Sequence, residues 1–319
     1  MKKYKVAIVG LGIMGRRMVT NFSKHPLFEV IGVWDPSNIS KTRTQKEFPD
    51  IQIVETPQQI IDEQNTDLLY VACPPEFHKL YALQAIDANI PVYLEKPLGV
   101  DNDESEELAD LFDKSSVPCS VNFVQASSEA LEATQQALKD EKLGRVIGVD
   151  IIVQYQQWPR EWQVEADWLR FRASGGYVRE VLSHFIFVVE RLFGPSNIKF
   201  SQPKYPVDPK LCETHILSQI NCAGLPINIF GSNGGIGPDR QELTIWGSEQ
   251  SFRISDFYFL ETSENVTWQP FLSEDNDPRT TTLQRQLDNV GKWLAGEPHP
   301  LASVREALSV QKIIERLLI

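Results

Sequence analysis

The chain has 319 residues and a formal net charge of −12, with 42% hydrophobic and 23% charged residues. This length suits two domains, and the composition is that of an ordinary globular protein. Because an acidic surface repels a phosphate backbone, we expect no nucleic acid partner. An anionic cofactor remains compatible with this charge, since a helix terminus or an arginine can outweigh it locally.

The cysteines and the N-terminus point to a cytoplasmic protein. The four cysteines form no C-x-x-C pair and fit no zinc spacing, so we expect reduced thiols and no metal site; they are Cys73, Cys119, Cys212 and Cys222. The apolar stretch near the N-terminus is interrupted by Gly10 and Gly12 and does not resemble a signal peptide. We find no apolar run long enough for a membrane span, and expect no membrane partner.

Segments with strand and helix patterns alternate up to about residue 123. The strands are expected at 5–9, 28–34, 67–72, 91–94 and 118–123. The helices are expected at 13–24, 38–48, 77–88 and 101–114, the last with acidic residues in its first turn. This alternation indicates a doubly wound parallel sheet with helices on both faces.

The pattern changes after residue 123. Runs of alternating polarity predict strands at 146–156, 198–202, 213–221, 226–231, 242–246 and 252–260, which together suggest one antiparallel sheet. Helices are expected at 127–140, 176–192, 282–294 and 304–318, and Ser303 with Glu306 predicts a capping box for the last one. We therefore predict an α/β domain over 1–122, an α+β domain over 123–300, and a C-terminal helix over 301–319 that packs back on the first domain.

A glycine-rich loop opens the first predicted helix. The residues from Gly10 to Gly15 fit G-x-G-x-x-G, with Ile13 and Met14 between the second and third glycines. In a dinucleotide site Gly10 permits the tight turn, Gly12 lets the pyrophosphate approach the backbone, and Gly15 lets the helix pack on the strand. The phosphates then lie at the positive end of the helix dipole. Because the loop follows a strand and precedes a helix, it predicts a Rossmann dinucleotide-binding domain.

An acid at the end of the second strand bears on the choice of cofactor. Asp35 lies twenty residues beyond Gly15, where a carboxylate can accept hydrogen bonds from both ribose hydroxyls. Its charge repels a 2′-phosphate, so we predict NAD. Arg43 is near enough in sequence to reach a phosphate, which leaves NADP open.

Two later strand ends carry further candidates, since ligands of open parallel sheets bind beyond the carboxyl ends of the strands. The third strand runs into Cys73, Pro74 and, four residues on, His78; the fourth ends at Glu95 and Lys96. We expect these residues to contact the cofactor, with Lys96 directed at the nicotinamide. The alternative is a surface pair of lysine and glutamate, which contributes little.

These motifs together resemble the glucose-fructose oxidoreductase and inositol dehydrogenase (Gfo/Idh/MocA) family. The resemblance extends over essentially the whole chain and rests on Gly10 to Gly15, Cys73-Pro74-Pro75 with His78, Glu95-Lys96-Pro97, and Gly175-Gly176 with His184. It implies an NAD(P)-dependent oxidoreductase acting on a small molecule, with Lys96 in catalysis or substrate binding. It also implies a C-terminal domain with a large, mostly antiparallel open sheet, through which the chain forms a homodimer or homotetramer.

The resemblance implies a catalytic pair after the double glycine. Glu180 and His184 stand where the family has an acid and a histidine, and residues four apart share one helix face. His184 would act as the general base or acid and Lys96 would stabilise the alkoxide or relay the proton. Two residues depart from the family pattern: Glu180 replaces a commoner aspartate, and Phe187 stands where many members have another one. The alternative for His184 is a histidine hydrogen-bonded inside the domain.

Aromatic and basic residues precede this helix. Indole faces stack on sugar rings and arginine holds carboxylates, which makes Trp168, Arg172 and Arg179 weak candidates for substrate binding. The alternative is that the aromatic residues anchor a long loop.

Three functions compete at this point. The first is hydride transfer between nicotinamide and a small carbonyl or hydroxyl compound, sugar-like or polyol-like. The second keeps the cofactor but reduces a C=N or C=C bond, or uses NAD transiently. The third is a dinucleotide-binding regulatory protein without turnover.

Overall fold

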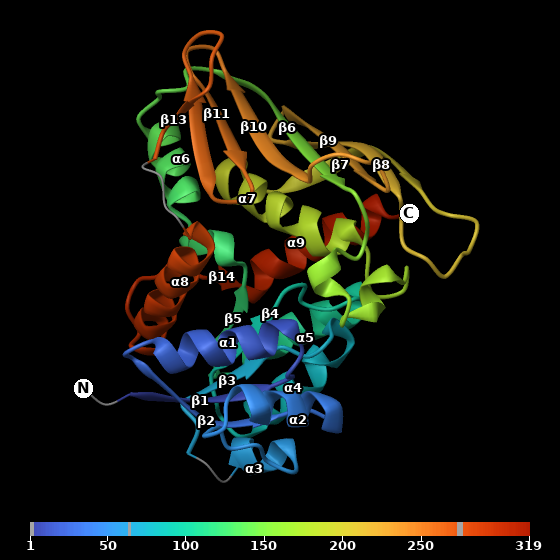
Figure 1. Cartoon of the computed structure of the whole chain (residues 1–319). Coiled ribbons are helices and arrows are strands. Elements are labelled where there is room, and N and C mark those ends of the chain that lie inside the picture. The colour runs from blue at the N-terminus through green and yellow to red at the C-terminus, as the bar shows by residue number, and fades with distance from the viewer. Residues whose placement is uncertain (1–2, 63–64, 273–276) are drawn as a thin grey trace. The chain divides into compact units, whose positions relative to one another are not determined.

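The computed structural model describes residues 3–62, 65–272 and 277–319. The chain divides into two compact units, Met1–Phe123 with Leu283–Leu308 and Val124–Thr282 with Ser309–Ile319. Each unit contains one large sheet (Figure 1). The predicted fold class, a parallel Rossmann-like sheet plus a larger and mostly antiparallel one, is confirmed.

The sheet of the first unit has the strand order β14-β5-β4-β3-β1-β2. Its strands are β1 (Tyr4–Val9), β2 (Phe28–Trp34), β3 (Leu68–Val71), β4 (Val92–Glu95), β5 (Cys119–Asn122) and β14 (Ala302–Ser303). All of them pair in parallel except β14, which adds an antiparallel edge that the sequence did not predict. The chain leaves β1 first toward β2 and later returns to β3 on its other side. The carboxyl ends of β1 and β3 therefore form the switch point where such sheets bind ligands.

Helices accompany this sheet (Figure 1). They are α1 (Ile13–Lys24), α2 (Asn38–Glu47), α3 (Pro57–Asp62), α4 (His78–Asp87), α5 (Asn102–Lys114) and most of α8 (Pro278–Leu294). The short helix α3 was not predicted. At the start of α9 (Val304–Leu317) the predicted capping box is present, because the Glu306 carboxylate accepts from the Ser303 N–H at 2.9 Å and Ser303 Oγ accepts from the Glu306 N–H at 3.2 Å.

The sheet of the second unit has the order β13-β12-β11-β10-β6-β9-β8-β7. Its strands are β6 (Val146–Tyr155), β7 (Ser196–Lys204), β8 (His215–Cys222), β9 (Leu225–Asn233), β10 (Arg240–Gly247), β11 (Ser251–Ser255), β12 (Phe259–Ser263) and β13 (Gln269–Pro270). Every pair is antiparallel except β6 with β9. The prediction of one strand over 252–260 was wrong, because the chain turns back at residues 256–258 and forms two strands.

Only one face of this second sheet is covered. Along β6 every second residue from Val149 to Tyr155 is fully buried, whereas the residues between them are partly exposed. The helices of this unit are α6 (Glu129–Lys139), α7 (Ser183–Phe193) and the end of α9, and α7 is preceded by the π-helical turn η5 (Val178–Leu182). The turn corrects the predicted continuous helix 176–192. π-Turns inside helices often occur at functional sites.

Candidate functional site

Two glycines of the loop between β1 and α1 are required by the fold itself. Gly10 has a φ of +95°, and a Cβ atom there would lie 2.5 Å from the backbone nitrogen of Cys73. A Cβ atom on Gly15 would lie 1.8 Å from the carbonyl oxygen of Gly10. No side chain fits at either position, because the nearest atoms belong to the backbone.

Gly12 differs from both. Its φ is −66°, which any residue adopts, and a Cβ atom built on it meets no heavy atom of the described chain within 4 Å. The fold therefore does not require a glycine at this position. The open space lies at the N-cap of α1, where backbone N–H groups and the helix dipole favour an anion. The loop thus fits the pyrophosphate of a dinucleotide, with Ile13 and Met14 in the first helical turn.

Asp35 ties this loop to the second strand. Its side chain is only 9% exposed, and its carboxylate accepts hydrogen bonds from the N–H groups of Leu11 at 2.7 Å and Ser37 at 2.7 Å. Each carboxylate oxygen has a second lone pair, which leaves acceptors for ribose hydroxyls. Asp35 therefore holds the glycine loop in addition to its predicted role at the ribose.

His78, which follows β3, has a role that differs from the predicted cofactor contact. The His78 ring is 1% exposed, with Nε2 3.0 Å from the Cys73 carbonyl and Nδ1 3.2 Å from the Leu98 carbonyl. Burial lowers the pKa of His78 to about 4, and burial raises the pKa of the Cys73 thiol to about 12, so both are neutral at pH 7. The neutral ring has one N–H, so it donates to one of these two carbonyls and packs against the other, between the chain segments that follow β3 and β4. We assign it a positioning role, not a cofactor contact.

Glu95 is part of a buried network. The Tyr70 hydroxyl and, at 2.9 Å, the Asn122 amide both donate to its carboxylate, which is 6% exposed as a residue. The Tyr93 hydroxyl donates to Asn122 Oδ1 at 2.7 Å and accepts from the Gln286 amide of α8 at 2.6 Å. This network fixes the end of β4, and Glu95 is a structural residue.

Lys96 follows Glu95 at the carboxyl end of β4 and is half-buried. Ligands of an open parallel sheet bind beyond the carboxyl ends of its strands, which is where Lys96 lies. Sequence reasoning did not predict the side chains that bind Glu95. The only sign of them in the sequence is the presence of Tyr, Asn and Gln in elements that are otherwise apolar.

His184 lies in the first turn of α7 and its ring is held by a buried amide. Nδ1 is 2.7 Å from Oε1 of Gln125, which is 3% exposed. An amide oxygen only accepts hydrogen bonds, so Nδ1 carries the hydrogen and the neutral ring has its lone pair on Nε2. This is the tautomer of a base that acts through Nε2. Gln125 was not predicted, because it lies 59 positions from the histidine.

Glu180 and the double glycine belong to the turn before α7. Glu180 is half-buried within η5. Gly176 has a φ of +103°, and its Cβ atom would lie 2.6 Å from the carboxylate of Glu213. Glu213 is 1% exposed and accepts the N–H of Val178 at 2.8 Å, and burial raises its pKa to about 7. Glu213, a residue that sequence reasoning missed, therefore anchors the start of the helix that carries His184 and explains Gly176.

Of the three weak candidates for substrate binding, Arg179 is held by contacts inside the fold. Arg179 is 7% exposed, and its guanidinium forms two hydrogen bonds to Glu315, at 2.6 and 2.7 Å, and two to the carbonyls of Arg172 and Gly175. With these donors used inside the fold, Arg179 is corrected to a structural anchor. The Arg172 guanidinium lies 3.7 Å from the centre of the Tyr205 ring, and Trp168 is half-buried in a 3₁₀ turn.

Other kinds of site were sought over residues 3–62, 65–272 and 277–319. No group of three or more His, Cys, Asp or Glu side chains in these ranges could hold a metal ion. No helix within them has the length and apolar character to cross a bilayer. All four cysteines are free thiols.

Comparisons with known proteins bear on the family and the fold. Residues 4–123 match the model of the GFO_IDH_MocA oxidoreductase family, described as an NAD-binding Rossmann fold. An oxidoreductase of Formosa agariphila is 26% identical over 81% of this chain and 80% of its own length. The scyllo-inositol 2-dehydrogenase (NADP(+)) IolW of Bacillus subtilis is 25% identical over 60% of this chain and 53% of its own length.

A solved structure extends the likeness of fold to the whole chain. The myo-inositol 2-dehydrogenase from Lactobacillus plantarum superposes with a TM-score of 0.80 at 18% identity, covering 99% of this chain and 96% of that one. Residues 4–123 therefore form an NAD-binding Rossmann domain of the GFO_IDH_MocA oxidoreductase family, and the chain as a whole has the fold of this solved dehydrogenase.

Proposed function

We propose that the protein transfers a hydride between nicotinamide and a carbon that bears a hydroxyl or carbonyl group in a small sugar-like or polyol-like compound. One observation carries the proposal. Nδ1 of His184 lies 2.7 Å from the amide oxygen of Gln125, which only accepts hydrogen bonds, and this contact favours the tautomer whose Nε2 accepts a proton. A catalytic base must be fixed in orientation as well as in tautomer, and a buried amide at 2.7 Å does both.

Each residue has a defined part in the oxidation of an alcohol. His184 Nε2 removes the hydroxyl proton while the C–O bond becomes a carbonyl, and in the reverse direction it returns that proton. The Lys96 ammonium stabilises the negative charge that develops on the oxygen. When bound, the nicotinamide supplies the acceptor for the hydride that leaves the carbon. Glu180 has a supporting part in orienting the substrate or the histidine.

The glycine loop and Asp35 are the residues that would hold the cofactor. Gly10, Gly12 and Gly15 shape the phosphate site at the start of α1, and the carboxylate of Asp35 favours the unphosphorylated ribose of NAD over NADP. Cys73 and Pro74 line the neighbouring strand end in this proposal.

A second candidate is a reaction on a C=N or C=C bond, or transient use of NAD. It is favoured by Phe187, which is 1% exposed with the Arg191 guanidinium 4.8 Å from its ring centre. No carboxylate stands at this position to help the histidine relay a proton. A regulatory protein without turnover is the remaining alternative, and the ordered tautomer of His184 argues against it.

A screen with both cofactors tests the proposal. The protein is incubated with NAD or NADP and a panel of inositols, aldoses and sugar phosphates, or with NADH or NADPH and a panel of keto acids, and the absorbance of reduced nicotinamide is recorded. We expect one equivalent of NADH per carbonyl formed, and a higher kcat/KM with NAD than with NADP. Product formed without net NADH would support transient use. Tight cofactor binding with no hydride exchange across the panel would support a regulatory protein.

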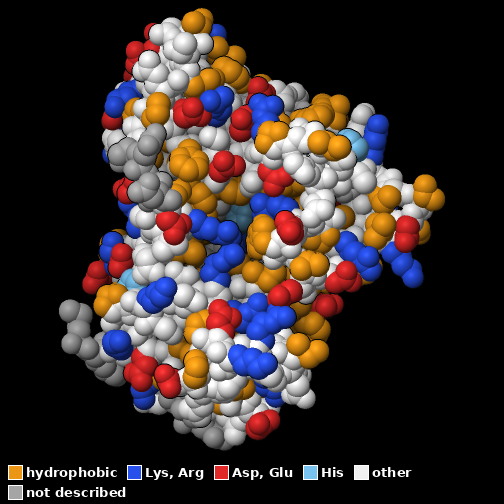
Figure 2. Space-filling model, in the orientation of Figure 1, with side chains coloured by type: hydrophobic (Ala, Val, Ile, Leu, Met, Phe, Trp, Pro, Cys, Tyr) orange, Lys and Arg blue, Asp and Glu red, His pale blue; other side chains and the backbone are white. Residues whose placement is uncertain are grey.

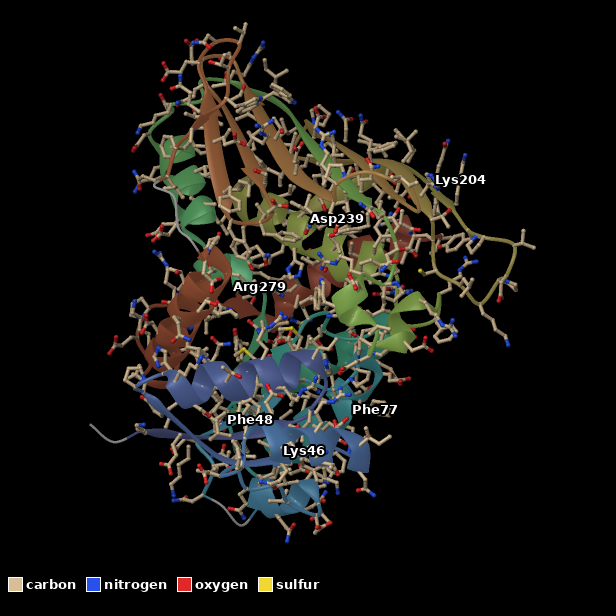
Figure 3. All side chains as sticks on the ribbon, in the orientation of Figure 1. Lys46, Phe48, Phe77, Lys204, Asp239 and Arg279 are labelled. Atoms are coloured by element: carbon tan, nitrogen blue, oxygen red, sulfur yellow. The ribbon has the colours of Figure 1, made fainter. Side chains whose placement is uncertain are left out.

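We also propose that two or four copies associate through the outer face of the second sheet. Four large apolar side chains on this face are between 42% and 49% exposed: Leu217, Phe230, Trp246 and Phe259. Leu217 and Phe230 are paired across β8 and β9. Hydrophobic side chains are also visible among charged ones on the surface of this unit in Figure 2. A patch of this kind is typical of a surface that a partner covers.

The polar groups beside the patch are already satisfied. Across neighbouring strands, Gln219 donates to Asn228 at 2.9 Å, Asn228 to Asp150 at 2.9 Å, and the Trp246 indole to Asp150 at 2.7 Å. These bonds lower the cost of removing the face from water, because fewer polar groups are left without a partner.

The double variant Leu217→Asp with Phe230→Asp should therefore be monomeric in sedimentation or light-scattering experiments, with an unchanged circular dichroism spectrum. The control is Val207→Asp, at a fully exposed loop position, which should keep the oligomer of the wild type. A wild-type protein that is monomeric at micromolar concentration would refute this assembly.

As to location, the four free thiols support the proposal that the protein works in the reducing cytoplasm.

A further inference from the structure

The turn between β11 and β12 has an unusual backbone. Its central residues, Asp256 and Phe257, have φ values of +48° and +69°, and the Tyr258 N–H donates to the Ser255 carbonyl at 3.1 Å. Two successive positive φ angles define a type I′ turn, for which Asn-Gly is the usual sequence. A phenylalanine in the left-handed region is rare, because its Cβ approaches the backbone.

The phenyl ring of Phe257 contacts the helix that carries the proposed base. Its centre lies 5.4 Å from that of the His184 imidazole in an edge-to-face arrangement, with an interplanar angle of 65°. It also stacks on Phe185 at 5.0 Å and 26°. The ring is half-buried, so part of it is accessible. Gln125 holds His184 by a hydrogen bond and Phe257 covers another side of the ring.

The strained turn is informative because the turn itself gains nothing from a phenyl group. Asparagine or glycine would form the same I′ turn with less strain. Residues kept in sparsely populated backbone regions are concentrated at binding and catalytic sites. The feature that distinguishes Phe257 from those alternatives is the ring that it places against His184.

We propose that Phe257 determines substrate specificity at His184, by favouring substrates that present C–H groups rather than a hydroxyl on the side of the reacting carbon that faces the phenyl ring. This inference rests on the proposed function, in which His184 Nε2 exchanges a proton with the substrate. The compounds concerned are deoxy sugars, deoxy polyols or related alcohols, not fully hydroxylated polyols.

Reach and hydrogen bonding limit which groups of a substrate can lie beside the phenyl ring. An oxygen that gives its proton to Nε2 lies about 3 Å from that nitrogen, so the carbons attached to it come within reach of a ring that touches the imidazole. A hydroxyl pressed against a phenyl face leaves its hydrogen bonds unmade, whereas a C–H group packs there without loss. A site of this kind discriminates between the two compounds by roughly one or two orders of magnitude.

The test compares pairs of substrates that differ by one hydroxyl. The probes are L-rhamnose with L-mannose, L-fucose with L-galactose, 2-deoxy-D-glucose with D-glucose, and a deoxyinositol with myo-inositol, each with NAD and the full-length protein. For the pair that the wild type oxidises best, we expect a higher kcat/KM for the deoxy compound. Phe257→Asn, which keeps the left-handed turn, should lower the ratio of the two kcat/KM values about tenfold.

Two further variants distinguish an effect of the phenyl ring on the substrate from an effect of the substitution on the fold. Phe257→Leu restores an apolar side chain and should recover most of the ratio. Val266→Asn introduces the same amide at an apolar residue in the loop after β12, at a site 96% exposed, and should leave the ratio unchanged. Wild-type circular dichroism and melting behaviour in each variant exclude loss of the hairpin as the cause.

A second readout does not depend on turnover. Of the five histidines, the ring signal that disappears in the NMR spectrum of His184→Asn should shift in Phe257→Asn and stay in place in Val266→Asn, because ring currents act over a few ångströms. An unmoved His184 signal, or an unchanged ratio in a protein that turns over the probes, overturns the role of Phe257 while the proposed function stands. If the wild type turns over none of the probes, the proposed function is wrong. The proposed role of Phe257 in substrate specificity is then wrong as well, even if the His184 signal shifts in Phe257→Asn.

Discussion

Gly12→Ala should weaken the binding of NAD by a factor of about ten or more, with a change in the free energy of unfolding within about 1 kcal/mol. The methyl group meets no atom of the described chain within 4 Å and the φ of −66° suits alanine, so the fold tolerates the change. The same methyl group occupies the space through which a pyrophosphate approaches the N-terminus of α1. Titration calorimetry with NAD and thermal unfolding measure the two quantities on one preparation.

Gly15→Ala is the matched control, with the opposite expected result for stability. Its Cβ would lie 1.8 Å from the Gly10 carbonyl oxygen, so α1 or the loop must move, which we expect to cost about 3 kcal/mol of stability or more. If Gly12→Ala binds NAD as tightly as the wild type, the phosphate site is not at this loop. If Gly12→Ala unfolds as readily as Gly15→Ala, the inference that the space beside Gly12 is open is wrong.

Removal of either proposed catalytic group should nearly abolish turnover. His184→Asn and Lys96→Met should each lower kcat by about 10²–10⁴, the usual contribution of a positioned acid or base. His184→Asn removes the proton acceptor, and Lys96→Met keeps the aliphatic stem but removes the charge that stabilises the alkoxide. Steady-state kinetics on the best substrate of the screen, together with the Kd for NADH, separate loss of chemistry from loss of cofactor.

His215→Asn is the control for the histidine variant. His215 lies on β8, is exposed, and has Nδ1 3.1 Å from the hydroxyl oxygen of Thr214, so its replacement should leave kcat at the wild-type value. Turnover by His184→Asn at the wild-type rate would remove this residue from the mechanism. A loss of NADH binding in His184→Asn would assign it to the cofactor instead.

The elements of the first unit were accessible from sequence because their signals are local. The prediction of a helix over 13–24 agrees with α1, and that of a strand over 28–34 agrees with β2. A glycine-rich turn, a run of β-branched residues and an amphipathic helix each leave a pattern within a dozen positions. The capping box at Ser303 was equally local, and it is present.

The hairpin at residues 256–258 shows where local patterns fail. Asp256 and Phe257 are not the residues that mark a type I′ turn, so the apolar run over 252–260 gave no sign of the reversal. What stabilises Phe257 there includes its contacts with His184 and Phe185, some seventy positions earlier. Tertiary packing has overridden the intrinsic preference of the turn.

The residues of the candidate site also fall into two groups, those with a local sequence pattern and those without one. The glycine loop, Asp35, Lys96 and His184 could be proposed from sequence because each belongs to a short motif. The residues that hold them, among them Gln125 and Glu213, were missed because their hydrogen bonds link distant segments. Arg179 was misjudged for a related reason, since its salt bridge to Glu315 spans 136 positions and no sequence pattern reveals it.

The central claim is that this chain moves a hydride between nicotinamide and a substrate carbon. The most direct measurement uses NADH deuterated at the transferable position of C4, the keto form of the best substrate, and mass spectrometry of the product. The account predicts one deuterium on the new carbinol carbon per NADH consumed, with a rate that collapses in His184→Asn. Product without deuterium, or product formed with no net consumption of NADH, would contradict it.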